Sequence, residues 1–234
     1  MLEALKTQTC EANLALVRSG LVLQTWGNAS AIDRKAGRVV IKPSGVAYDL
    51  MHPEDMVVVD LDGDVAEGAL RPSVDLPAHL VLYHAFPEIN AVVHTHSHYA
   101  TCFAQARRPI PCFGTTHADY FYGEVPLTEP LTEAEVEEDY ERHIGEAIVR
   151  RYASFDALME PADQAATHAR FVRGATVGEA VENAVVLEEV ARMALHTLTL
   201  NTDAVPLERH LLDKHFLRKH GKGAYYGQTT EGAR

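Results

Sequence analysis

His94 and His96, separated by one threonine, are the residues whose type and spacing most directly suggest chemistry. The β-branched residues before them predict a strand over residues 91–96, and residues i and i+2 of a strand project from the same face. Two imidazoles would therefore point together and could share one divalent ion. An isolated pair of this kind is more often two ordinary histidines at a strand end, so both interpretations stay open at this point.

Two further residues could complete such a metal site. A catalytic zinc ion typically has three protein ligands and one open position. His168, between a predicted strand and a long predicted helix, is a candidate third ligand. Asp75 could coordinate the ion or orient a bound water. An acid two residues before Pro77 also suits the start of a helix, which is the simpler interpretation of Asp75 taken alone.

Short turns and isolated polar residues supply the remaining candidates. Residues 26–30 and 42–45 are predicted loops whose backbone N–H groups could bind phosphate oxygens, although simple turns would have the same composition. Asp119 could move a proton if its site is desolvated, or could merely hydrogen-bond its own turn. His215 and Tyr226 lie near the C-terminus, where two adjacent tyrosines beside a glycine are unusual for a fraying end.

The composition sets limits on the class of protein. The 234 residues are 47% hydrophobic and 23% charged, which suits one globular domain. The net charge of −12 argues against a nucleic-acid binder. Three cysteines without a Cys-x-x-Cys motif indicate a reduced, cytoplasmic setting, and no apolar stretch is long enough to span a membrane.

Helical and strand patterns alternate along the chain and would position these residues. Helices are predicted over residues 2–18, 77–86, 132–150, 179–199 and 206–219, and strands over residues 38–42, 56–61 and 91–96. Such alternation predicts a sheet covered by helices, without fixing the order of the strands.

Taken in chain order, these segments resemble the class II aldolase family, and within it the branch of sugar-phosphate epimerases. The resemblance is carried by residues 25–30, 41–45, 93–97, 114–123, 186–190, 212–215 and 225–228. The His-Thr-His strand is typical of the whole family, whereas the Thr-Thr-His-Ala-Asp-Tyr block and the Tyr-Tyr-Gly-Gln ending are typical of the epimerase branch. The match defines one domain over residues 1–228, followed by a tail at 229–234.

The resemblance implies an α/β fold, namely a three-layer α/β/α sandwich with a central, largely antiparallel sheet. It also implies a homotetramer with fourfold symmetry whose active sites lie between neighbouring subunits. It identifies His94, His96 and His168 as zinc ligands with Asp75 at or beside the metal, although Mn²⁺ or Co²⁺ could replace zinc.

The resemblance also implies roles for residues outside the metal site. Asp119 and Tyr226 would carry protons, Tyr226 from the next subunit, and His215 would support the aldehyde intermediate. The implied substrate contacts, mostly around a phosphate, are Gly27, Asn28, Lys42, Ser44, Gly45, Ser73 and Val74.

The activity implied is inversion of C4, which interconverts L-ribulose 5-phosphate and D-xylulose 5-phosphate. The C4 proton is not acidic because C4 is not next to the carbonyl, so a retro-aldol step would break the C3–C4 bond. Rotation of the aldehyde and aldol addition to its other face would give the epimer, with a metal stabilising the enediolate. A product-releasing class II aldolase, of the fuculose-phosphate type or a related lyase, and a non-catalytic module like the adducin head are the alternatives.

Two segments depart from the family pattern. Val74 stands where a serine hydroxyl is usual, which predicts weaker or altered phosphate binding through the remaining backbone N–H. His168 is followed by Ala169 and Arg170 rather than by the usual Gly-Pro, so the third ligand lies in a segment that has drifted.

Overall fold

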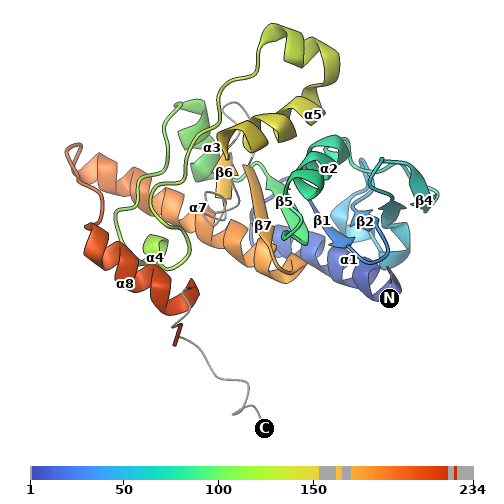
Figure 1. Cartoon of the computed structure of the whole chain (residues 1–234), viewed down its shortest axis with the longest axis horizontal. Helices are drawn as coiled ribbons and strands as arrows, with labels where there is room; N and C mark the ends of the chain where they lie inside the picture. Colours follow the sequence, from blue (N-terminus) through green and yellow to red (C-terminus); the bar gives the residue numbers. More distant parts are fainter. Residues whose placement is uncertain (1, 153–161, 165–169, 221–223, 226–234) are drawn as a thin grey trace.

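The computed structural model describes residues 2–152, 162–164, 170–220 and 224–225, and a sheet lies between two groups of helices (Figure 1). The strands of this part of the chain form one sheet with the order β4-β3-β2-β1-β5-β7-β6, in which all neighbours are antiparallel. The strands are β1 (Asn28–Asp33), β2 (Arg38–Ile41), β3 (Val57–Val59), β4 (Val65–Glu67), β5 (Ala91–Thr95), β6 (Ala162–Gln164) and β7 (Arg170–Gly174).

Alternating side chains of the central strands enter two different cores. In β2, Val40 belongs to one buried cluster whereas Val39 and Ile41 belong to the other. In β5, Val93 and Val92 divide in the same way. Because successive residues of a strand face opposite sides, both faces of the sheet are covered, which gives three layers.

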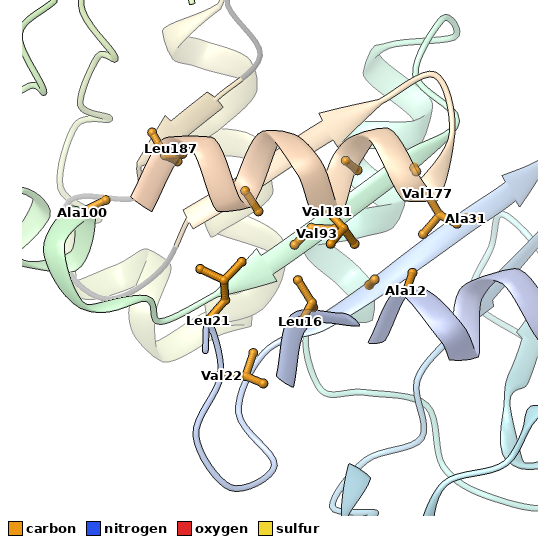
Figure 2. Close-up of a cluster of buried hydrophobic side chains, with 14 of the residues drawn as sticks. Ala12, Leu16, Leu21, Val22, Ala31, Val93, Ala100, Val177, Val181 and Leu187 are labelled. Carbon is orange, nitrogen blue, oxygen red and sulfur yellow. The ribbon is translucent and has the colours of Figure 1, made fainter. Parts of the chain in front are cut away.

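The helices divide between these two faces. On one face lie α1 (Leu2–Arg18), α3 (His98–Gln105) and α7 (Val177–Leu200), and on the other lie α2 (Leu76–Ala85) and α5 (Glu133–Arg151). Figure 2 shows the first core, to which α7 contributes Val177, Val181 and Leu187, α1 contributes Leu16 and β5 contributes Val93. The short helix α4 (Thr115–Ala118) contacts α8 (Arg209–His220) at one end of the molecule (Figure 1). Two 3₁₀ turns, η1 (Tyr48–Leu50) and η2 (Pro53–Asp55), precede β3.

Local sequence signals explain where the long helices begin. Thr132 accepts a hydrogen bond from the backbone N–H of Glu135, whose carboxylate accepts from the backbone N–H of Thr132, so α5 starts with a capping box. Thr176 caps α7 by accepting from the N–H of Glu179. These caps satisfy N–H groups that have no partner inside the helix.

The predicted fold is confirmed, and every predicted helix and strand is present with its ends shifted by only a few residues. One local prediction is wrong, because residues 28–30 form part of β1 rather than a loop. Their small side chains lack a β-branched signature, and the strand is fixed instead by pairing with β2 and β5. Within the described ranges, no helix is long and apolar enough to cross a bilayer. The predicted tail at 229–234 lies outside the described residues.

Candidate active site

A cavity of about 440 Å³ opens where β1 and β5 meet the loops that precede β1 and follow β2. Its lining contains every residue predicted as a substrate contact, together with His94, His96 and Asp75. The lining residues are Thr25, Trp26, Gly27, Asn28, Lys42, Pro43, Ser44, Gly45, Ser73, Val74, Asp75, His94 and His96. Asn28 pairs with His94 in the β1–β5 ladder, which brings the two sides of the cavity together.

The two histidines approach each other closely. His94 is buried on β5, and His96 lies one residue beyond the strand and is exposed. Their Nε2 atoms are 3.1 Å apart and their rings are nearly perpendicular. Two nitrogens bound to one tetrahedral zinc ion at about 2.05 Å would lie about 3.3 Å apart. The pair therefore fits two positions of one metal ion.

The described residues do not form a complete metal site. Among them, no group of three histidine, cysteine, aspartate or glutamate side chains could hold an ion. Asp75 lies beside the histidine pair, with its Oδ1 atom 4.0 Å from Nε2 of His94. His168, the predicted third ligand, lies outside the described residues.

Asp75 is held by polar partners rather than acting as a helix cap. It occupies the position before α2, but its side chain makes no capping hydrogen bond. Its Oδ2 accepts from the Asn28 amide at 2.6 Å and from the Ser73 hydroxyl at 3.3 Å. Burial raises the pKa of Asp75, but the nearby His94 and His79 and the hydrogen bonds from Asn28 and Ser73 outweigh it, so the pKa is lowered overall. The carboxylate is thus kept charged beside the histidine pair.

Asn28 also offers an acceptor inside the protein. Its Nδ2 group donates to Asp75 and, at 3.0 Å, to the hydroxyl of Ser73. Its Oδ1 atom is buried and has no hydrogen-bond partner among the described residues. Because a buried polar atom without a partner is costly, this oxygen suits a ligand that donates a hydrogen bond.

Gly27 lets the loop before β1 lie directly against β5, the strand that carries His94. Its φ is +78°, and an added Cβ would lie 2.8 Å from the carbonyl oxygen of His94 and 2.8 Å from a methyl of Val22. Only glycine fits this conformation and this close approach. The Tyr48 hydroxyl donates to the Gly27 carbonyl at 2.8 Å and fixes the loop from the other side.

Lys42 supports the second loop of the cavity from within. Its side chain is 2% exposed, and its ammonium donates to the carbonyls of Pro43 and Val46 at 3.1 and 3.0 Å. It also lies over the ring of Tyr48. Burial lowers the pKa of Lys42, an effect opposed by Asp75. Lys42 therefore holds the turn that presents the exposed Ser44 and Gly45 to the cavity.

A buried polar chain lies behind the metal side of the cavity. The Ser30 hydroxyl lies 2.7 Å from Nδ1 of His79 and 2.8 Å from the hydroxyl of Tyr83. His79 is fully buried, and burial lowers its pKa to about 3, so it is neutral near pH 7. These residues could not be predicted from the sequence, since a histidine on an apolar helix face has no distinctive signal.

Asp119 and His215 lie apart from the cavity. Neither lines it, and they contact each other instead, with 2.9 Å between Oδ1 and Nδ1. Arg218 donates to both oxygens of Asp119 at 2.8 and 2.7 Å. Burial raises the pKa of Asp119, but hydrogen bonds from Arg218 and His215 and the charge of Lys219 lower it overall. Tyr226, the other predicted proton carrier, lies outside the described residues.

Arg218 is a partner that the sequence analysis missed. It follows His215 by three residues on α8, and side chains with this spacing share a helix face. The spacing could have indicated that both residues reach the same carboxylate. The predicted site residues that the structure describes thus fall into two groups, one at the cavity and one between α4 and α8.

Comparison with known proteins defines the class to which this fold and site belong. The family model for the class II aldolase and adducin N-terminal domain matches residues 7–195. The chain therefore belongs to the class II aldolase and adducin N-terminal domain family.

Particular relatives narrow the comparison. The chain is 51% identical over 227 residues to the L-ribulose-5-phosphate 4-epimerase UlaF of Salmonella typhi, covering 97% of this chain and 100% of the relative. The UlaF protein of Salmonella choleraesuis matches to the same extent. An L-fuculose 1-phosphate aldolase structure superposes with a TM-score of 0.77 at 24% identity, covering 91% of this chain and 94% of that one. The likeness to the aldolase structure shows the fold alone.

Proposed function

We propose that the protein is an L-ribulose-5-phosphate 4-epimerase, which interconverts L-ribulose 5-phosphate and D-xylulose 5-phosphate. The observation that carries the proposal is the convergence of His94, His96 and Asp75 on one cavity. The chain in which these residues converge also matches the epimerase relatives over 97% of its length. A non-catalytic module would not need to keep this group of residues together.

We propose zinc as the resident metal, with Mn²⁺ or Co²⁺ as possible substitutes, held by His94, His96 and His168. A bound divalent ion would polarise the ketose oxygens and stabilise the negative charge that develops as the C3–C4 bond breaks. Asp75, kept charged by its surroundings, would lie beside the ion and orient groups bound there.

The turn after β2 and the adjacent Ser73 would hold the phosphate. Ser44 and Gly45 are exposed on the turn held by Lys42, and Ser73 lies beside this turn because its backbone N–H donates to the carbonyl of Lys42 at 2.9 Å. Backbone N–H groups and hydroxyls of this kind bind phosphate oxygens. Anchoring the phosphate would keep the aldehyde fragment in place between cleavage and re-addition. Val74 contributes no hydroxyl, so its part in phosphate binding would be through its backbone N–H.

The proton carriers would come from a neighbouring subunit. Asp119 and His215 do not line the cavity of their own chain, yet the reaction needs proton transfer at the C4 oxygen. A homotetramer in which α4 and α8 of one subunit approach the cavity of the next would bring Asp119 to the substrate, together with Tyr226. We propose this assembly, and a cytoplasmic location in which Cys10, Cys102 and Cys112 stay as free thiols.

Identification of the products from L-ribulose 5-phosphate tests the proposed reaction. We expect D-xylulose 5-phosphate as the sole new species in a carbon NMR time course. Accumulation of glycolaldehyde phosphate would instead indicate an aldolase that releases its products, and would contradict the epimerase proposal.

Mixing two inactive variants tests the placement of the site between subunits. His94→Ala removes a proposed metal ligand, and Asp119→Asn removes a proposed proton carrier. If each site combines both from different chains, random co-assembly restores roughly a quarter of the sites. Activity no higher than that of either variant alone would place both residues in one chain.

A further inference from the structure

Glu188 on α7 connects this helix to the chain segment that follows His96. Its Oε2 atom accepts a hydrogen bond of 2.9 Å from the hydroxyl of Ser97. Oε1 accepts from the backbone N–H of Tyr99 at 2.9 Å, and Oε2 also accepts from that of Ala100 at 3.2 Å. One carboxylate therefore binds three donors over four consecutive residues.

These donors belong to the start of α3, which begins at His98. The first N–H groups of a helix have no acceptor within it and normally bind a side chain at the preceding position. Ser97 occupies that position, but its hydroxyl makes no capping bond and instead donates to Glu188. A residue 91 positions away along the chain thus performs the capping. The negative charge of Glu188 also suits the positive end of the helix dipole.

His96 needs such support because the sheet does not hold it. The pairing of β5 with β1 ends at His94, and its pairing with β7 ends at Thr95. His96 is exposed and lies between the end of the ladder and Ser97. Its backbone is therefore fixed on one side by the strand and on the other by the residues that Glu188 binds.

The helix that carries Glu188 is itself firmly anchored. Leu187 is 1% exposed and shares a buried cluster with Ala100 of α3, and both are labelled in Figure 2. The carboxylate is thus presented from a rigid element, which is what an outer support of a metal site requires.

We infer that Glu188 is a positioning residue for the metal site: by binding Ser97, Tyr99 and Ala100 it fixes the backbone that aims His96 at His94. The inference rests on the proposed metal-dependent function. It assigns to Glu188 no contact with substrate or metal. Its loss would displace the His96 imidazole from the 3.1 Å approach to His94.

The chain supplies a matched control for Glu188. Glu189 is the next residue of α7, and its carboxylate pairs with Arg192 at the surface rather than with α3. Glu188→Ala and Glu189→Ala remove the same group from adjacent positions. Glu188→Gln keeps one acceptor oxygen, and Ser97→Ala removes one of the three donors while leaving α7 unchanged. The last two variants keep the test informative if Glu188→Ala does not fold.

The experiment measures Co²⁺ affinity by competition with a chelator, together with the visible absorption of the bound Co²⁺, in the full-length protein. Loss of an outer-shell partner typically costs about 10- to 100-fold in metal affinity. We expect a loss of about 10-fold or more for Glu188→Ala with an altered Co²⁺ spectrum, smaller losses for Glu188→Gln and Ser97→Ala, and a change of less than about 2-fold for Glu189→Ala.

Unaltered affinity and spectrum in Glu188→Ala would overturn the inference, even if the urea midpoint of the metal-free protein fell, because Glu188 would then only cap α3. If Glu188→Ala does not fold, unaltered affinity in both Glu188→Gln and Ser97→Ala would overturn it equally. If the unmodified protein bound no Co²⁺ or Zn²⁺, the proposed function would fail as well. The two failures are therefore distinguishable.

Discussion

The side-chain amide of Asn28 donates a hydrogen bond of 2.6 Å to the carboxylate of Asp75, although the two residues are 47 positions apart in the sequence. This contact joins the first strand of the sheet to the start of α2 at the wall of the cavity. It fixes an acid beside the histidine pair.

Asn28→Ala tests the importance of this contact. The change removes the donor to Asp75 and the buried Oδ1 acceptor. A hydrogen bond to a charged group contributes about 1.5–3 kcal/mol, so we expect kcat/KM for L-ribulose 5-phosphate to fall about 10- to 100-fold. Asn90→Ala, which removes a surface amide bonded to the Ala175 carbonyl, is the control and should leave kcat/KM unchanged. Equal values for the two variants would show that the Asn28 contact has no functional role.

His168→Ala tests the third predicted metal ligand. We expect the variant to lose bound metal because two histidines alone leave the ion with too few protein ligands. Metal content is measured by atomic spectroscopy of the purified protein, and subunit assembly by light scattering. The prediction requires an intact assembly with much less metal than the unmodified protein. An unchanged metal content would remove His168 from the site.

Val74→Ser tests the departure at the phosphate side of the cavity. The Val74 side chain is 64% exposed at the cavity wall, so a hydroxyl there could donate to a phosphate oxygen. A neutral hydrogen bond contributes about 0.5–1.5 kcal/mol, which corresponds to a KM lower by about 2- to 10-fold with little change in kcat. Val74→Ala, which adds no donor, is the control. A KM for Val74→Ser no lower than that of the control would contradict this prediction.

His117→Gln tests the acid sensitivity of the fold. His117 is buried, and burial lowers its pKa from an ordinary value of 6.5 to about 4, an effect partly opposed by a hydrogen bond to the backbone of Gly123. Below pH 6.5 the unfolded chain binds a proton that the folded chain does not bind until about pH 4. The free energy of unfolding therefore falls as the pH is lowered through this window, and His117 has no such effect above it.

We expect the His117→Gln variant to show a shallower fall over the same window. One proton difference corresponds to about 1.4 kcal/mol per pH unit, which is the upper limit of the expected change in slope. Urea unfolding at a series of pH values and one protein concentration measures it. The same slope in both proteins would indicate that His117 is protonated in the folded state.

The sequence predicted most of the fold because long periodic segments determine their own structure. The helices α1, α5 and α7 carry apolar stripes and, in the last two, threonine caps, and they begin within two residues of the predicted positions. The start of β1 was missed because residues 28–30 have small side chains and pair with β5, which is distant in the sequence. No local pattern shows this tertiary pairing.

The residues of the candidate site likewise fall into those that could be predicted from the sequence and those that could not. Residue types and the family resemblance were enough to select the lining of the cavity, since the predicted substrate contacts and Asp75 meet there. The supports of that lining were not predictable. Glu188 and Tyr48 act through contacts with residues that are distant in the sequence, and no local pattern shows such contacts.

In the proposed reaction, His94 and His96 hold a metal on which the epimerisation of L-ribulose 5-phosphate depends. The most direct measurement is the rate of D-xylulose 5-phosphate formation before chelation, after removal of metal, and after Zn²⁺ is returned. We expect a rate that disappears with the metal and returns with Zn²⁺ in the unmodified protein, but does not return in His94→Ala. A rate that is indifferent to chelation, or the absence of D-xylulose 5-phosphate from the fully metallated protein, would contradict it.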